Sequence, residues 1–180
     1  ICPTEVAKKE AVFYATQARE SFPYYQHEKI GYNYRLSNVC AGIGRGQMEV
    51  LEEHIAHHKH VHQLYQKAFE SVDGISLQVN PNHDFDSNFW LSTILIDENK
   101  TGVNYETLRV ELDKKNIDTR PLWKPLHLQP VFSSSPAYVD GTSERLFQQG
   151  LCLPSGPCVS DEDVQYVVDC IMECLSVSYK

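Results

Sequence analysis

Residues 51–79 read LEEHIAHHKHVHQLYQKAFESVDGISLQV and change from a helical to an extended pattern. Six side chains in the first part recur at steps of four and three residues: Leu51, Ile55, His58, His62, Tyr65 and Phe69. That spacing places them on one face of an α-helix. The segment 72–74 (VDG) ends this helix, and the alternation over 75–79 is typical of a half-buried strand.

The rest of the chain extends this pattern in both directions. The helical pattern begins near Ser37, so we expect one long helix over about 37–69, preceded by a helix over 5–16. Downstream we expect a strand over 89–96, a helix over 104–115 capped by Asn104, a short strand over 117–120, a proline-rich loop over 121–136 and a last helix capped by Ser160. This order predicts an α+β fold in which a long helical arm leads into a small sheet.

Composition and charge exclude several classes of protein. The chain has 180 residues, 42% of them apolar, which is typical of a globular domain and not of a disordered chain. Its net charge is −8, whereas a general nucleic-acid binder carries a basic surface. No apolar run approaches the roughly 20 residues of a membrane helix. The chain opens ICPTE, with neither an initiator Met nor a signal segment, so we expect a piece of a longer, cytoplasmic protein with reduced thiols.

Histidines and glycines offer two further patterns. His54, His58 and His62 follow one another at i, i+4, a spacing that can chelate zinc, but the H-E-x-x-H signature is absent. Packing of these imidazoles at a helix interface is the alternative, and we expect no metal. Residues 41–47 (AGIGRGQ) follow no strand and lack the dinucleotide fingerprint. Small residues there permit close packing, so we expect the 39–47 region to associate with a neighbour.

Two segments concentrate groups that bind ligands. Residues 31–35 (GYNYR) place an amide and a guanidinium before a helix, where they could hold a phosphate. Residues 119–130 (TRPLWKPLHLQP) offer two cations, an indole and an imidazole on a segment that prolines stiffen. Such a set suits an anionic ligand with a ring to stack, for example a nucleotide sugar. A plain aromatic turn and a surface loop are the alternatives.

Three segments together resemble one family. Residues 31–49, the 120–130 loop and the L-x-L-P segment at 151–154 are similar to sugar-nucleotide aminotransferases of the DegT/StrS type. These are pyridoxal-phosphate enzymes with the aspartate-aminotransferase fold. The resemblance covers about residues 14–175, and the W-K-P-L-H wording is closest to members that aminate UDP-linked 4-keto-6-deoxy sugars.

The resemblance implies a function and a set of roles. Members hold pyridoxal phosphate on a lysine and move an amino group, usually from glutamate, to a keto sugar nucleotide as homodimers. Asn33 is then expected to contact the cofactor phosphate of the partner subunit, together with Arg35. The expected sugar-nucleotide contacts are Arg120, Trp123, Lys124 and His127.

The Schiff-base lysine is expected upstream of this chain, because Lys8, Lys9 and Lys29 stand in the wrong sequence context. The chain would then be a C-terminal fragment with no catalytic residue of its own, inactive alone and binding no cofactor. The expected parts are the tail of the large domain with the active-site turn (1–36), a connecting helix (37–71) and the C-terminal small domain (72–180). A non-catalytic nucleotide-sugar-binding module and a metal-binding helical protein are the alternatives.

Overall fold

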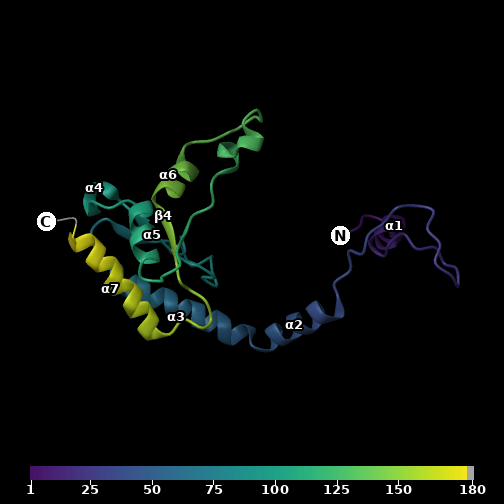
Figure 1. Cartoon of the computed structure of the whole chain (residues 1–180), viewed down its shortest axis with the longest axis horizontal. Coiled ribbons are helices and arrows are strands. Elements are labelled where there is room, and N and C mark those ends of the chain that lie inside the picture. The colour runs from purple at the N-terminus through teal and green to yellow at the C-terminus, as the bar shows by residue number, and fades with distance from the viewer. Residues whose placement is uncertain (178–180) are drawn as a thin grey trace. The chain divides into compact units, whose positions relative to one another are not determined.

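The computed structural model describes residues 1–177 and divides the chain into two compact units, Ile1–Leu51 and Glu52–Lys180. We call them unit 1 and unit 2 and describe each by itself. Figure 1 follows the chain from purple at the N-terminus to yellow at the C-terminal helix. The three-part division at residues 36 and 71 stays a prediction.

Unit 1 consists of two short helices and the loop that joins them. Its helices are α1 (Glu5–Ala15) and α2 (Asn38–Glu49). The Thr4 hydroxyl caps α1 by accepting from the Ala7 amide at 3.1 Å, and the Ser37 hydroxyl caps α2 by accepting from the Cys40 amide at 3.1 Å. Ala18 is the one buried residue among the described residues of unit 1. Local hydrogen bonds, not a core, therefore hold this unit.

The sequence predicts a single helix over 37–69, but the structure has two helices. α2 ends at Glu49, and α3 (Leu51–Phe69) begins after Val50, whose φ of −114° and ψ of 10° leave the helical region. The three glycines of α2 each cost about 1 kcal/mol relative to alanine in a helix. Branching at the Val50 β-carbon lowers helix propensity further. The local sequence therefore provides little to keep the helix continuous.

Unit 2 is built on a four-stranded sheet that is antiparallel throughout, in the order β1-β2-β4-β3. Its strands are β1 (Ile75–Leu77), β2 (Ser92–Ile96), β3 (Arg120–Pro121) and β4 (Gly150–Leu153). The sequence predicts the first three within a few residues. It does not predict the inner strand β4, whose four residues are all buried and show no alternation. The predicted α+β fold with a small antiparallel sheet is confirmed.

One face of this sheet carries the core. Three helices supply apolar side chains to it: α3, α5 (Tyr105–Asp113) and α7 (Asp161–Val177). Ile94 and Ile96 of β2 and Leu151 and Leu153 of β4 complete the same cluster. The Tyr65 hydroxyl donates to the Pro154 carbonyl at 3.0 Å. Figure 1 shows α5 and α7 close together beside β4.

The second face of the sheet carries a row of polar side chains. Side chains alternate between faces along a strand, so Thr93 points away from the core that Ile94 enters. The register pairs Thr93 with Cys152, and Cys152 with Arg120. Gln78 is the residue after β1, and its backbone amide donates to the Thr93 carbonyl at 3.1 Å. Gln78 therefore lies in the same row as Thr93. Residues in one row share a face, so a hydroxyl, a thiol, a guanidinium and a carboxamide lie on this side.

Both predicted helix caps of unit 2 are confirmed. The Asn104 side chain accepts from the Thr107 amide at 2.9 Å, at the start of α5. The Ser160 hydroxyl accepts from the Asp163 amide at 3.1 Å, while the Asp163 carboxylate accepts from the Ser160 amide at 2.9 Å. Two further helices, α4 (Glu98–Thr101) and α6 (Thr142–Gln149), were not predicted. None of the helices over residues 1–177 is long and apolar enough to cross a membrane.

Candidate functional site

The turn at residues 31–35 is fixed to the end of α1 by backbone hydrogen bonds. The Tyr32 amide donates to the Tyr14 carbonyl at 3.2 Å, and the Tyr34 amide donates to the Ala15 carbonyl at 3.0 Å. Gly31 is required here because a β-carbon would lie 2.5 Å from the backbone nitrogen of Ala18. The chain therefore places this turn by its backbone and leaves its side chains free to contact a ligand.

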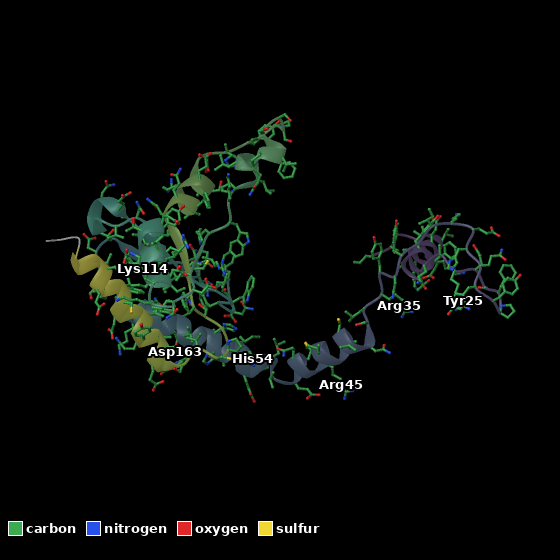
Figure 2. The ribbon with its side chains drawn as sticks, viewed as in Figure 1. Tyr25, Arg35, Arg45, His54, Lys114 and Asp163 are labelled. Atoms are coloured by element: carbon green, nitrogen blue, oxygen red, sulfur yellow. The ribbon has the colours of Figure 1, made fainter. Side chains whose placement is uncertain are left out.

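The side chains of this turn point outward and are polar or aromatic. Asn33 and Arg35 are both exposed, and the Asn33 side-chain oxygen accepts from the Arg35 amide at 3.3 Å. The rings of Tyr32 and Tyr34 stack with centroids 5.7 Å apart. Within residues 1–177 the Arg35 guanidinium forms no ion pair with a carboxylate. An uncompensated guanidinium beside an amide is a donor set that fits a phosphate. Figure 2 labels Arg35, where the turn leads into α2.

The second candidate segment begins at the edge strand β3. Arg120 lies in β3, and its guanidinium donates to the Asp118 carboxylate at 3.0 Å; both side chains are exposed. Leu122 packs closely over the backbone of Gly150, so this part of the loop lies against the second face of the sheet. Trp123 is 69% exposed, and Lys124 beside it is also exposed. An indole and two cations thus face solvent along one short run of chain.

His127 is held differently from its neighbours. It lies in the 3-10 turn η1 (Leu126–Leu128), and its Nε2 atom is 2.8 Å from a carboxylate oxygen of Glu144. Glu144 occupies the first turn of α6, and the two side chains are 17% and 36% exposed. The carboxylate fixes the orientation of the imidazole. Sequence reasoning missed Glu144, because an acidic residue in a first helical turn signals only a helix start.

The structure therefore brings the predicted residues together only in part. Asn33 and Arg35 share one turn of unit 1. Arg120, Trp123, Lys124 and His127 lie along β3 and the loop after it, in unit 2. No hydrogen bond or ion pair joins any two of these four side chains in the described part of the chain. Their partners are instead Asp118 for Arg120 and Glu144 for His127.

The histidine cluster does not assemble into a metal centre. No group of three or more His, Cys, Asp or Glu side chains among residues 1–177 is placed to hold a metal ion. His62 is buried, its ring stacks on Phe89 with centroids 3.8 Å apart, and its Nδ1 atom is 3.4 Å from the Ser92 hydroxyl. Burial lowers the pKa of His62 below its ordinary value. Packing is therefore the better interpretation of this histidine.

Comparison with known proteins identifies relatives over nearly the whole chain. The model of the DegT/DnrJ/EryC1/StrS aminotransferase family matches residues 4–172. EpsN of Bacillus subtilis (strain 168), by name a pyridoxal phosphate-dependent aminotransferase, is 38% identical over 173 residues, which are 93% of this chain and 43% of EpsN. GDP-perosamine synthase of Escherichia coli O157:H7 is 34% identical over 149 residues, 83% of this chain and 39% of the synthase.

Solved structures share the fold. The aminotransferase TlmJ of Streptoalloteichus hindustanus matches with a TM-score of 0.83 at 19% identity, over 99% of this chain and 47% of TlmJ. At that identity the likeness concerns the fold alone. The chain spans less than half the length of each of these relatives.

Proposed function

The chain belongs to the DegT/DnrJ/EryC1/StrS aminotransferase family, and from this membership we propose that it is part of an enzyme that aminates a keto sugar nucleotide. The observation that carries the proposal is the family match over residues 4–172, which includes both the 31–35 turn and the 120–130 loop. The proposed amino donor is an amino acid, glutamate first. The proposed setting is a cytoplasmic homodimer.

Pyridoxal phosphate is the cofactor of this family and, when bound, supplies the electron sink for moving an amino group. We assign Asn33 and Arg35 to its phosphate, in the partner subunit's site. The uncompensated guanidinium of Arg35 and the exposed carboxamide of Asn33 support this assignment. A phosphate would accept hydrogen bonds from both, and the turn's backbone bonds to α1 would set their position.

The 120–130 loop is assigned to the sugar nucleotide. Lys124 supplies a cation for the diphosphate, Arg120 supplies the guanidinium donors that its ion pair with Asp118 leaves over, and the exposed Trp123 indole offers a face for stacking. His127 contributes a hydrogen-bonding group whose direction Glu144 sets. Exposure of the indole and of both cations supports these roles, because each is reachable by a ligand.

The Schiff-base lysine is proposed to lie outside these 180 residues. Lys8 donates to Glu5 at 3.2 Å on the exposed surface of α1, and Lys29 lies 5.6 Å from the centre of the Tyr14 ring. Neither stands in a cavity that would desolvate an amine and lower its pKa, as a covalent cofactor site requires. On this proposal the chain alone neither holds the cofactor covalently nor catalyses the transfer.

The test is a titration with pyridoxal phosphate, followed by borohydride reduction and intact mass. It is run on this chain and on the product of the full reading frame. We expect a covalent adduct on the longer product and none on this chain. A single labelled lysine in this chain would contradict the placement of the catalytic lysine. Absence of an adduct on both would favour a non-catalytic nucleotide-sugar-binding module.

A further inference from the structure

The segment between β1 and β2 is joined to α3 by two side-chain contacts. We call residues 80–91 of this segment the strap. Lys59 of α3 forms an ion pair with Asp86 of the strap at 2.6 Å. Three residues further along α3, the His62 ring stacks on the Phe89 ring, with centroids 3.8 Å apart and 12° between the ring planes. The strap is therefore attached to α3 at two places, one ionic and one aromatic.

Phe89 holds a backbone conformation that a bulky side chain rarely adopts. Its φ is 48°, in the left-handed region. Such a conformation costs free energy and persists only where surrounding contacts enforce it. The stack on His62 is one such contact, and the bond from the Phe89 amide to the Ser87 hydroxyl at 3.0 Å is another. Loss of the stack would allow this part of the strap to relax.

His62 lies beneath the strap in surroundings that suit a neutral imidazole. The residue is 2% exposed. Its Nδ1 atom lies 3.4 Å from the Ser92 hydroxyl, and its Nε2 atom is buried without a hydrogen-bond partner in the described part of the chain. A protonated imidazole carries two N–H donors, so the closed strap would leave one of them unsatisfied.

The groups around His62 offer a proton there little compensation. Lys59 and Asp86 neutralise each other, and the Tyr65 and Ser155 hydroxyls donate to backbone carbonyls. The titratable and hydroxyl groups near the imidazole come from α3, the strap, β2, the segment after β4 and α7: His58, Lys59, Tyr65, Asp86, Ser92, Ser155 and, beside Tyr65, Asp163. Burial is what lowers the pKa of His62.

The Phe89 ring would attract a protonated imidazole, which opposes opening. This attraction offsets only part of the cost, because a buried charge without an acceptor is far more unfavourable than a cation–π contact is favourable.

We infer that the strap is a latch operated by one proton: it is closed over His62 while the imidazole is neutral and opens when the imidazole is protonated. Opening brings the imidazolium into water and relieves the backbone of Phe89. As the pH falls below about 6.5, the closed strap loses favour by up to about tenfold per pH unit. The latch lies within unit 2 and does not depend on the proposed function.

The test is an NMR titration of this chain with isotope-labelled histidine, in which the His62→Gln variant identifies the His62 signal. We expect the shift that the Phe89 ring imposes on His62 to disappear with the same midpoint as proton uptake. The circular dichroism of the helices should persist at that pH. If the ring shift remains on the protonated imidazole, or if the helical signal is lost with it, no local opening occurs and the inference is wrong.

Asp86→Asn gives a sharper test, because opening and direct electrostatics predict opposite signs. The variant lacks the ion pair with Lys59, so the strap should open more readily. His62 should then bind its proton up to about fivefold more tightly, the range for one exposed ion pair. Without opening, loss of a carboxylate beside a lysine would weaken proton binding at His62. Unchanged or weaker binding therefore overturns the latch.

Asp161→Asn is the matched control. Asp161 also pairs with α3, through His60 at 2.8 Å, but it belongs to α7 and not to the strap. This variant should leave proton binding at His62 unchanged. An effect as large as that of Asp86→Asn would mean that long-range charge, not the strap, governs the imidazole.

Phe89→Gly removes the stack, and glycine tolerates the positive φ. His62 should then reach water and titrate near its ordinary pKa of 6.5. If His62 in this variant titrates as it does in the unmodified chain, the strap does not enclose the imidazole and the latch is wrong.

Discussion

Unit 1 and unit 2 differ in what holds them together. Unit 2 gathers 18 buried side chains, from its helices, its strands and the segments between them, into one core. Unit 1 buries Ala18 alone, and its helices are 11 and 12 residues long. Helices of that length are marginal in water unless they pack against something. The core of unit 2 therefore stabilises its fold from within. By contrast, α2 exposes apolar side chains that nothing in unit 1 covers, among them Val39, Ile43 and Met48.

The largest expected effect comes from substituting one side chain in each unit and comparing the losses of stability. Leu108 of α5 is fully buried, so Leu108→Ala should lower the free energy of unfolding of unit 2 by about 2–5 kcal/mol. Val39 of α2 is 73% exposed, and Val39→Ala should change stability by about 0.5 kcal/mol or less. Urea denaturation followed by circular dichroism measures both. Equal effects of the two substitutions would show that α2 is covered in solution, as the predicted association through 39–47 requires.

A smaller effect separates two glycines inside unit 1. A β-carbon at Gly31 would meet the Ala18 backbone, whose amide donates to the Phe13 carbonyl at 2.9 Å, so Gly31→Ala should destabilise the turn by about 1–3 kcal/mol. We expect hydrogen exchange at the Tyr32 and Tyr34 amides to be faster in this variant than in the unmodified chain. No atom lies within 4 Å of a β-carbon at Gly44. Gly44→Ala should therefore stabilise α2 by about 1 kcal/mol and slow hydrogen exchange in that helix.

The outcome for Gly31 also bears on the proposed function. If Gly31→Ala leaves the Tyr32 and Tyr34 amides as protected as before, the turn is not held by α1. The assignment of Asn33 and Arg35 to a phosphate would then lose its positional argument.

The same contrast explains what the sequence could predict. Local signals were enough for the apolar face of α3 and for the caps at Asn104 and Ser160, because each depends on residues within one or two helical turns. The candidate residues in 31–35 and 119–130 were found from their chemistry and from a family resemblance. Their roles stay predictions.

Three features of the structure could not be predicted from the sequence. β4 is a short buried strand without alternation, and it is recognisable only once β2 and β3 are in place on either side. Glu144 lies 17 residues from His127, and no spacing rule joins them. The interruption at Val50 depends on a small balance of propensities, of about 1 kcal/mol per glycine.

The smallest expected effect is a pH dependence that belongs to unit 2. Burial lowers the pKa of His62 in the folded state below the ordinary value of 6.5 that applies to the unfolded chain. Between those two values the unfolded chain binds a proton that the folded chain does not. The free energy of unfolding therefore falls as the pH drops below about 6.5, by at most about 1.4 kcal/mol per pH unit.

His62→Gln should remove this contribution, because glutamine does not titrate. Urea denaturation at pH 7.5, 6.0 and 5.0 measures the slope for both proteins, whatever their stability at neutral pH. Hydrogen exchange in α1, corrected for intrinsic rates, should not follow this slope, since unit 1 buries no titratable side chain. An unchanged slope in the variant would mean that water reaches the imidazole. The stack of His62 on Phe89 would then be looser than the 3.8 Å ring separation indicates.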